Sequence, residues 1–409
     1  MTHETSILLP SATVDFFVKD AQTVESAKAL SSDWRFARVA VNIHGGGVEG
    51  AIEYFAKGQA SDIIMIETDV TDESFTDRLG VLSSHCHENT SAIVIGPVND
   101  VNLYRSLTSM GVSDYLVRPV PSDTLAEVIA QTLIQKLGAA GARLVAVMGA
   151  KGGIGVSSVA QLLGAASSGL LGQKTLLFDA AGAWSSLGVG LGFEPVAGTA
   201  EALRAAGAKD MDSLRRVLYQ ADEKFFVLAT GAEPMLDSGT QGAEFESFID
   251  VALSSHPVVI ADLSSAPPAL QKTILGRAHG IILLSAPTLP SLRNARSLIN
   301  EIRKIFGGQD KNIDLVINMA GMGGGKDIPA GDIKNALDME PFTTIPFDPK
   351  LFMGAENEGR QLIKDKAGEE IARSLLPLLK KAAGLENAAN DDRGAGLLGS
   401  LLGRIKSRK

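Results

Sequence analysis

The residues with the clearest chemical potential form a glycine-rich stretch, residues 145–158. Its sequence is Val-Ala-Val-Met-Gly-Ala-Lys-Gly-Gly-Ile-Gly-Val-Ser-Ser, with an apolar run before the glycines and a stretch rich in Ala, Leu and Gly after them. A strand, a glycine loop and a helix in this order direct backbone N–H groups and a helix N-terminus at one point, which suits a chain of phosphates. The residues expected to bind it are Lys151, Gly152, Gly153, Ile154, Gly155, Val156, Ser157 and Ser158.

The stretch departs from the P-loop pattern G-x-x-x-x-G-K-[ST] at two positions. Ala150 stands at the first glycine and Val156 at the lysine, whereas Gly155 and Ser157 keep the second glycine and the magnesium ligand. A strand-to-helix turn that uses glycine only for tight packing is the alternative. Lys151, the glycines and the paired serines at this spacing favour phosphate binding.

The pattern K-G-G-x-G-x-[ST], which begins at Lys151, resembles the deviant P-loop of the MinD/ParA group of dimerising ATPases. The form without the second lysine resembles the CpaE/TadZ branch of that group, which positions Flp (tight-adherence) pili. The resemblance covers residues 143 to about 384, with its motifs in the family's order. It implies ATP and Mg²⁺ as cofactors and a homodimer in which Lys151 reaches the partner's nucleotide.

Two apolar strands are expected to end in acids, Asp179 and Asp262. The resembled family has D-x-D at the first, and its second acid orients the water that attacks the γ-phosphate; Ala181 stands there in this chain. The second strand has the Walker-B pattern, in which a carboxylate holds Mg²⁺ through its water shell. The resemblance therefore implies Lys151 and Asp179 as catalytic residues and Ser157 and Asp262 as the metal site.

Three later residues are expected at the nucleobase. Asn318 closes a buried strand where the family has an asparagine that hydrogen-bonds adenine, although a polar residue that merely ends a strand would look the same. Pro346 and Asp348 lie in Ile-Pro-Phe-Asp, which resembles the family's I-P-x-D segment, whose backbone flanks the base. A stretch at residues 355–359 resembles the A-x-x-x-G sequence that follows it.

The substitutions Val156 and Ala181 bear directly on catalysis. The first removes a positive charge from the phosphates and the second removes water positioning, so ATP hydrolysis is expected to be slow or absent while binding survives. The expected function is an ATP-binding pilus assembly and localisation factor. The alternatives are a nucleotide-free pseudo-ATPase scaffold and a ParA-type DNA-segregating ATPase, which the same substitutions and the net charge of −9 disfavour.

The composition is that of a folded protein of two domains. The chain has 409 residues, of which 45% are hydrophobic and 21% charged. Cys86 is the single cysteine, which excludes an intrachain disulfide. The chain lacks both an apolar run of about 20 residues, as a spanning helix needs, and a leader-like N-terminus, so a cytoplasmic protein is expected, recruited to the inner membrane or the cell pole.

The first domain is expected to be a doubly wound parallel sheet, so that the chain contains two α/β domains of this class. Five apolar runs alternate with helical patterns; they are Val14–Val18, Arg38–Ile43, Ile63–Ile66, Ala92–Ile95 and Tyr115–Val117. Residues 111–119 are similar to the last strand of response-regulator receiver domains. The predicted boundaries are residues 1–137 for this domain, 138–142 for a linker, 143–384 for the P-loop domain and 385–409 for a tail.

Four positions that carry the phosphotransfer chemistry of receiver domains hold other residues in this chain. Glu67 stands at the phospho-accepting aspartate, Gly96 at the hydroxyl, Arg118 at the lysine, and the acidic pair is Lys19-Asp20. These changes indicate a receiver fold without phosphotransfer that binds pilus or secretion proteins or a polar landmark. A phosphorylatable receiver is the disfavoured alternative.

The tail ends in a short basic segment with apolar residues at helical spacing, Leu397–Lys409. Such a segment is typical of a helix that contacts a membrane surface or docks on its own domain, and the sequence leaves both open. Basic residues also follow one face of the helix expected after Pro290, where a solvated face is favoured over specific nucleic-acid binding.

Overall fold

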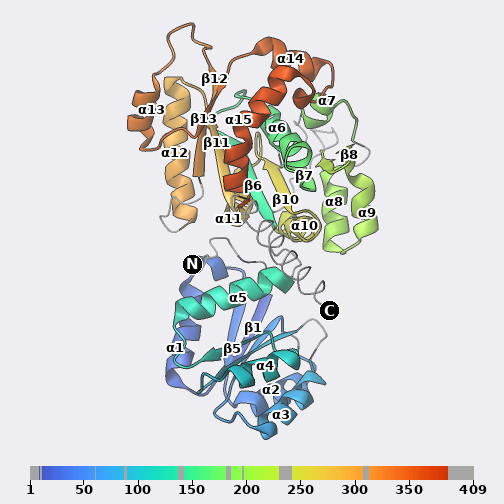
Figure 1. Ribbon diagram of the computed structural model, residues 1–409, viewed down its shortest axis with the longest axis vertical. Coiled ribbons are helices and arrows are strands. Elements are labelled where there is room, and N and C mark those ends of the chain that lie inside the picture. Colours follow the sequence, from blue (N-terminus) through green and yellow to red (C-terminus); the bar gives the residue numbers. More distant parts are fainter. Residues whose placement is uncertain are drawn as a thin grey trace, which may run out of the picture. The chain divides into compact units, whose positions relative to one another are not determined.

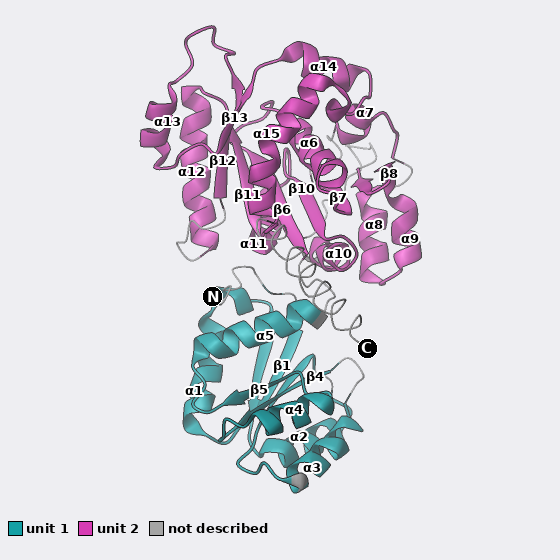
Figure 2. Ribbon diagram, in the orientation of Figure 1, with its two compact units in different colours: residues 1–140 teal, residues 141–409 magenta. Residues whose placement is uncertain are grey.

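The computed structural model describes residue 9 and residues 12–59, 61–86, 90–136, 142–180, 186–195, 198–229, 242–306 and 313–385. The chain divides into two compact units, residues 1–140 and 141–409, and each contains one sheet (Figures 1 and 2). Among the described residues no helix combines the length and the apolar composition needed to cross a membrane. The predicted tail helix, most of the linker and Ala181 lie outside the described residues.

Unit 1 has a five-stranded parallel sheet in the order β2-β1-β3-β4-β5, which is the doubly wound order of flavodoxin-like folds. Each strand overlaps a run predicted from the sequence. The strands are β1 Ala12–Phe17, β2 Val39–His44, β3 Ile63–Glu67, β4 Ser91–Gly96 and β5 Asp114–Val117.

Helices cover both faces of this sheet. Helices α1 and α5 pack on one face, and α2, α3 and α4 pack on the other, so that two separate apolar clusters form. Asp20, Asp72 and Asp100 start α1, α3 and α4 by accepting hydrogen bonds from first-turn N–H groups. The helices are α1 Ala21–Ala29, α2 Gly47–Phe55, α3 Glu73–Ser83, α4 Val101–Ser109 and α5 Ser122–Lys136, with 3-10 turns at Leu30–Ser32 and Trp34–Phe36.

Unit 2 has an eight-stranded sheet in the order β13-β12-β11-β6-β10-β7-β9-β8. The prediction of a doubly wound sheet is confirmed, but the sheet is not wholly parallel, because the edge strand β8 runs antiparallel to β9. The strands are β6 Arg143–Gly149, β7 Thr175–Asp179, β8 Tyr219–Asp222, β9 Phe225–Leu228, β10 Val258–Asp262, β11 Gly280–Ser285, β12 Ile313–Ala320 and β13 Thr343–Pro346.

The core of unit 2 is built around α6, Val156–Gly169, which packs between the sheet and α15, Lys366–Ala382 (Figure 1). Gly164 permits this close approach, because a Cβ there would lie 2.5 Å from Cε2 of Phe225. The other helices are α7 Leu187–Leu191, α8 Thr199–Gly207, α9 Met211–Val217, α10 Gly242–Ser255, α11 Pro268–Arg277, α12 Leu289–Ile305, α13 Ala330–Leu337 and α14 Pro349–Asn357, with a 3-10 turn at Leu362–Lys364.

The central strands β11, β6, β10 and β7 run parallel, so their carboxyl ends lie along one edge of the sheet. In open α/β sheets this edge is where ligands bind. The glycine loop after β6 and the acids that end β7 and β10 meet there.

Candidate functional site

The glycine loop connects β6 to α6 through two left-handed residues. Gly153 has φ of 73° and Gly155, the N-cap of α6, has φ of 81°, a region that side-chain-bearing residues rarely adopt. The N–H of Ala150 donates to the carbonyl of Leu284 at 2.8 Å and fixes the start of the loop. In the described chain no side chain caps the N-terminus of α6, so the N–H groups of its first turn stay available to a ligand.

Val156 lines the cavity, but its side chain packs into the core. It is 5% exposed and belongs to the core of unit 2. A Cβ on Gly149 would come within 2.6 Å of Val156 Cγ2, which shows how closely the valine packs against the end of β6. The apolar contact therefore holds the loop from beneath, and the loop has its shape without a cation at this position.

Asn318, at the end of β12, is tied to the same loop. It is 4% exposed; its Nδ2 donates to the carbonyl of Ile154 at 2.7 Å, and its Oδ1 accepts the N–H of Met319 at 2.9 Å. A Cβ on Gly155 would lie 2.8 Å from Asn318 Nδ2. Glycine is therefore needed at position 155 for two reasons, the positive φ and the close approach of the Asn318 side chain. The side-chain amide of Asn318, which was expected to hydrogen-bond adenine, thus positions the loop. One of its N–H groups remains available to another partner.

The two predicted acids lie side by side, since Asp179 and Asp262 are register partners on β7 and β10 and both are fully buried. Asp262 Oδ1 accepts the N–H of Ser264 at 2.9 Å, and Ser157 Oγ donates to Ser264 Oγ at 3.2 Å. Burial raises the pKa of the Asp262 carboxyl, although hydrogen bonds from Ser157 and Ser264 act in the opposite direction.

The second carboxylate oxygen of Asp262, Oδ2, is buried without a hydrogen-bond partner. Buried polar atoms are normally satisfied, so this oxygen suits a ligand that the protein alone does not supply. A hydrated divalent cation meets the requirement, because carboxylate and hydroxyl oxygens are the donors that Mg²⁺ prefers. The residues present therefore fit Mg²⁺ at Ser157 and Asp262.

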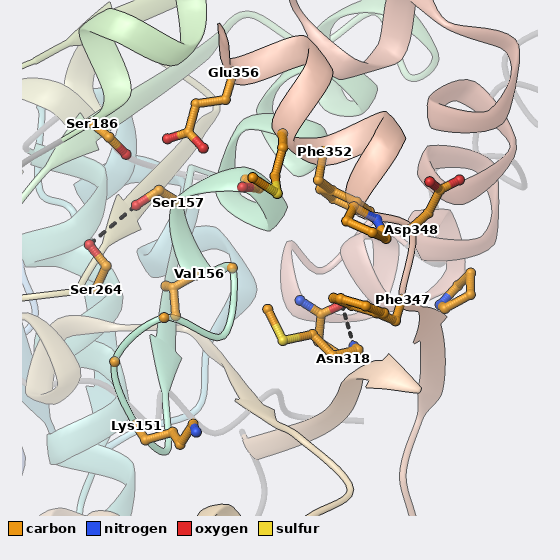
Figure 3. Close-up of a pocket in the computed structure, with 18 of the residues that line it drawn as sticks. Lys151, Val156, Ser157, Ser186, Ser264, Asn318, Phe347, Asp348, Phe352 and Glu356 are labelled. Atoms are coloured by element: carbon orange, nitrogen blue, oxygen red, sulfur yellow. Dashed lines mark hydrogen bonds between the residues drawn. The ribbon is translucent and has the colours of Figure 1, made fainter. Parts of the chain in front are cut away.

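These elements surround a cavity of about 410 Å³ (Figure 3). It brings together most of the predicted residues: Lys151, Gly152, Gly153, Gly155, Val156, Ser157, Ser158, Asn318, Pro346 and Asp348. Ile154, Asp179 and Asp262 are fully buried and do not line it. The sequence did not predict the remaining lining residues, which are Ser186, Ser264, Ser265, Met319, Phe347, Pro349, Phe352, Met353 and Glu356.

Some of the missed residues carried a usable signal. Ser264 and Ser265 follow Asp262 within three positions, and Phe347 lies between the predicted Pro346 and Asp348. The aromatic and methionine residues of α14 carried none, because their role depends on how that helix lies over the loop.

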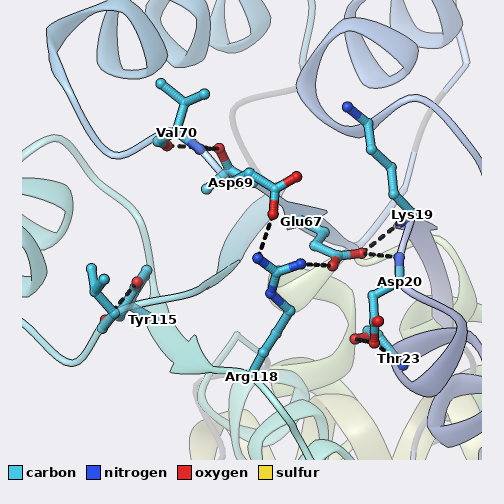
Figure 4. Close-up of polar contacts among 10 residues, drawn as sticks. Lys19, Asp20, Thr23, Glu67, Asp69, Val70, Tyr115 and Arg118 are labelled. Carbon is cyan, nitrogen blue, oxygen red and sulfur yellow. Dashed lines mark hydrogen bonds and ion pairs between the residues drawn. The ribbon is translucent and has the colours of Figure 1, made fainter.

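In unit 1, Glu67 at the end of β3 is the centre of a closed polar network (Figure 4). It is 2% exposed, and its Oε2 accepts the backbone N–H groups of Lys19 at 2.6 Å and Asp20 at 2.9 Å. Arg118 Nη1 donates to Glu67 Oε1 at 2.6 Å, and the guanidinium also pairs with Asp69. Both carboxylate oxygens of Glu67 are therefore engaged by the protein itself.

Gly96, at the end of β4, lies under the ring of Tyr115. A Cβ at Gly96 would be 2.2 Å from Tyr115 Oη, so no larger residue fits beneath the ring as it stands. Tyr115 is 8% exposed, and its hydroxyl donates to the carbonyl of Val98 at 2.8 Å. The ring fills the space in which a side-chain hydroxyl at position 96 would lie.

The Glu67–Arg118 pair makes unit 1 sensitive to loss of either partner. The Arg118→Met variant is expected to lose about 3 kcal/mol of stability, because it leaves a buried carboxylate without its counter-charge. Hydrogen exchange of peptides from β1 and β3 in the full chain measures the loss. Arg78→Met, which removes an exposed pair with Glu49, is the matched control and should cost much less. Equal exchange in the two variants would contradict the expectation.

No protein-family profile matches the sequence, and no curated protein matches it. Among solved structures, the ParA family ATPase from Chlorobium tepidum TLS aligns at 19% identity with a TM-score of 0.53, over 58% of this chain and 98% of that chain. The pilus assembly protein CpaE from Caulobacter crescentus CB15 aligns at 28% identity with a TM-score of 0.29, over 30% of this chain and 93% of its own. MinD from Pyrococcus horikoshii OT3, complexed with Mg-ADP, aligns at 19% identity with a TM-score of 0.48, over 61% of this chain and 97% of its own.

The match to the ParA family ATPase covers 58% of the chain. Unit 1 comprises only 140 of the 409 residues, so a match of this length must include residues of unit 2. At this identity the likeness concerns the fold. Unit 2, with its glycine loop at the carboxyl edge of the sheet, has the fold of the ParA family ATPase.

Proposed function

We propose that the chain binds Mg²⁺-ATP in the cavity of unit 2 and acts as a localisation factor rather than as a rapidly cycling ATPase. The observation that carries this proposal is the pairing of an uncapped helix N-terminus in the glycine loop with the unpartnered buried oxygen of Asp262. The first suits an anion and the second a cation; the helix N-terminus borders the cavity, and Asp262 is buried next to the lining residue Ser264, whose N–H it accepts.

In this proposal the protein supplies the following contacts. N–H groups of the loop and of the first turn of α6 bind phosphate oxygens, and Ser157 and Asp262 hold Mg²⁺, which when bound neutralises phosphate charge. Lys151 is exposed, as a residue that reaches a partner's nucleotide in a homodimer must be. Pro346, Asp348 and Asn318 line the cavity and would contact the base.

Slow or absent hydrolysis follows from Val156. Its side chain is in the core and offers no positive charge to the γ-phosphate, where charge stabilisation is usually the largest catalytic contribution. Asp179 remains as the acid of the first strand, buried beside Asp262. The absence of a second acid at Ala181 adds to the same expectation.

We further propose that a nucleotide-bound homodimer recruits Flp pilus or secretion proteins, or reads a polar landmark, through unit 1. The protein would be cytoplasmic and recruited to the inner membrane or the cell pole, with Leu397–Lys409 as a peripheral membrane contact and without specific nucleic-acid binding. The support is the motif resemblance together with the closed network at Glu67, which leaves unit 1 suited to protein contact rather than phosphotransfer.

A nucleotide-free scaffold is the second candidate, and one observation favours it. Contacts that the protein itself supplies, the packing of Val156 against Gly149 and the hydrogen bond from Asn318 to Ile154, hold the loop. The two candidates differ in a single measurable property, which is binding of ATP.

Calorimetric titration of the full chain with ATP and Mg²⁺ tests the proposal. Micromolar binding is expected, weakened about tenfold or more in Lys151→Ala, since a charge-assisted contact with phosphate contributes about 1.5–3 kcal/mol. Lys272→Ala, which removes an exposed lysine of α11 outside the cavity, is the matched control and should bind as the parent does. If no binding is detected at millimolar ATP, the nucleotide-free scaffold is the remaining candidate.

A further inference from the structure

A groove separate from the glycine-loop cavity lies between α13 and the edge of the sheet in unit 2. Helix α13 connects β12 to the edge strand β13, but it packs mainly against α12 rather than on the two strands that it joins (Figure 1). The space left between the helix and these strands has a volume of about 380 Å³. We call it the α13 groove.

The α13 groove is mainly apolar. Its apolar lining residues are Pro287, Ile317, Ala320, Ile328, Ile333 and Pro341. Thr344 of β13 is exposed and lines the groove, while its neighbour Ile345 belongs to the core on the other face of the sheet. A volume of this size holds a few side chains and not a helix, whose diameter with side chains is about 10–12 Å. The groove therefore suits apolar side chains that project from a segment lying across it.

The rim of the groove is acidic. The loop before α13, the helix and the turn after it contain four acids and two lysines, which are Asp327, Asp332, Asp338 and Glu340 against Lys326 and Lys334. Glu340 pairs with Lys334 at 2.8 Å. The carboxylates of Asp332 and Asp338 are exposed, and neither forms a hydrogen bond or an ion pair with another described residue. Their negative charge is available to a basic segment.

The end of α15 lies close to the groove. Lys381, in its last turn, sits over the ring of Phe342, and Phe342 is next in sequence to the lining residue Pro341. The described chain ends at Leu385, and the 11 residues 386–396 follow it. Fully extended, they span about 36–40 Å, whereas packed layers lie about 10 Å apart. The chain beyond them can therefore pass around the edge strand and reach the groove.

The segment Leu397–Lys409, which lies outside the described residues, is complementary to the groove in composition. It contains two pairs of leucines and carries four basic residues without an acid, which are Arg404, Lys406, Arg408 and Lys409. A tether of this length gives the segment an effective concentration in the millimolar range. An affinity of about 0.1 mM for the groove is then enough to keep the segment docked about 90% of the time.

We propose that Leu397–Lys409 docks in the α13 groove of its own chain, with leucine side chains in the apolar space and its basic end against Asp332 and Asp338. The docked leucines are not available to a lipid surface, so docking keeps the segment off the membrane until anionic lipid competes for it. The docking itself requires neither nucleotide nor lipid. Its regulatory consequence rests on the proposed membrane contact of the same segment.

Hydrogen exchange of the full chain without lipid tests the docking. The double variant Leu401→Asp, Leu402→Asp is expected to exchange up to about tenfold faster in peptides from α13 and β13, because a segment docked about 90% of the time slows any opening that requires it to leave by that factor. The double variant Ala388→Asp, Ala389→Asp adds the same charge to the connecting residues and is the matched control. It should exchange as the parent does; equal exchange in the two double variants would overturn the proposal.

The variant Thr344→Arg tests the groove side. It places a long cationic side chain in the groove from an exposed strand position, so it should fold as the parent does and release the basic segment. Faster exchange of α13 and severalfold stronger flotation with phosphatidylglycerol vesicles are expected. Gln220→Arg, at an exposed position of the opposite edge strand β8, adds the same charge and should change neither quantity.

The two readouts separate the docking from the proposed membrane contact. Unchanged exchange of α13 in Thr344→Arg would exclude docking in this groove, whatever the vesicles show. If exchange becomes faster while flotation stays as weak as in the parent, the docking stands and the membrane contact of Leu397–Lys409 fails.

Discussion

The Asp262→Asn variant is expected to be more stable than the parent protein in the absence of nucleotide and to lose the effect of Mg²⁺ on nucleotide affinity. The parent buries a carboxylate whose Oδ2 has no partner, and an amide in its place carries no charge to desolvate. The gain arises only from removal of the buried charge, because the amide is itself a polar group and lacks a partner at the position of Oδ2. Loss of the carboxylate should weaken Mg²⁺-ATP binding about 10–100-fold, as removal of metal-positioning groups commonly does.

Thermal unfolding without ligand and calorimetric titration with ATP, each with and without Mg²⁺, measure the two effects. Asp332→Asn is the matched control, since Asp332 is an exposed acid of α13 in the same unit. It should change neither quantity. A variant at position 262 that is less stable than the parent, with Mg²⁺ still enhancing ATP binding, would show that the buried carboxylate serves packing rather than a cation.

Acidification is expected to destabilise unit 2 through a buried histidine. His256, at the end of α10, is 5% exposed and stacks edge-on against Phe226; burial, assisted by the charge of Lys174, lowers its pKa to about 4. Because the pKa in the unfolded chain is about 6.5, the stabilisation is complete above that pH and is lost as the pH falls toward 4. The loss over this interval is on the order of 3 kcal/mol. His279, with a pKa lowered to about 3, acts in the same direction.

Pulse proteolysis in urea at a series of pH values follows unit 2 in the full chain. The His256→Phe variant keeps an aromatic contact with Phe226 and removes the titrating group, so its stability should fall less steeply between pH values of about 6.5 and 4. The slope is the informative quantity, since a change in packing shifts the stability at every pH alike. His85→Phe, at an exposed histidine of unit 1, should leave the slope unchanged; identical slopes in parent and His256→Phe would contradict the expectation.

The sequence predicted what depends on local pattern. Apolar runs of four to eight residues placed most strands, because strands buried in a parallel sheet are continuously apolar. The glycine loop was recognisable because left-handed positions such as Gly153 and Gly155 need glycine. The edge strand β8 and its neighbour β9 were missed; β8 alternates between half-buried and exposed positions rather than forming an apolar run.

The rest depends on contacts between distant parts of the chain. The hydrogen bond from Asn318 to Ile154 joins residues 164 positions apart, and the Glu67–Arg118 pair spans 51 positions. From the sequence, Val156 was visible as a missing lysine, but its burial against Gly149 was not. The same limit applies to Phe352 and Met353 of α14, because only the fold brings them to the cavity beside the glycine loop.

The contact between Tyr115 and Gly96 has a consequence for how unit 1 can change over generations. Any side chain at position 96 would place its Cβ 2.2 Å from Tyr115 Oη. A substitution of Gly96 therefore requires a smaller residue at position 115 first, and that step deprives the Val98 carbonyl of its donor and empties a buried space. The two positions are therefore coupled, and neither can change alone without a loss of stability.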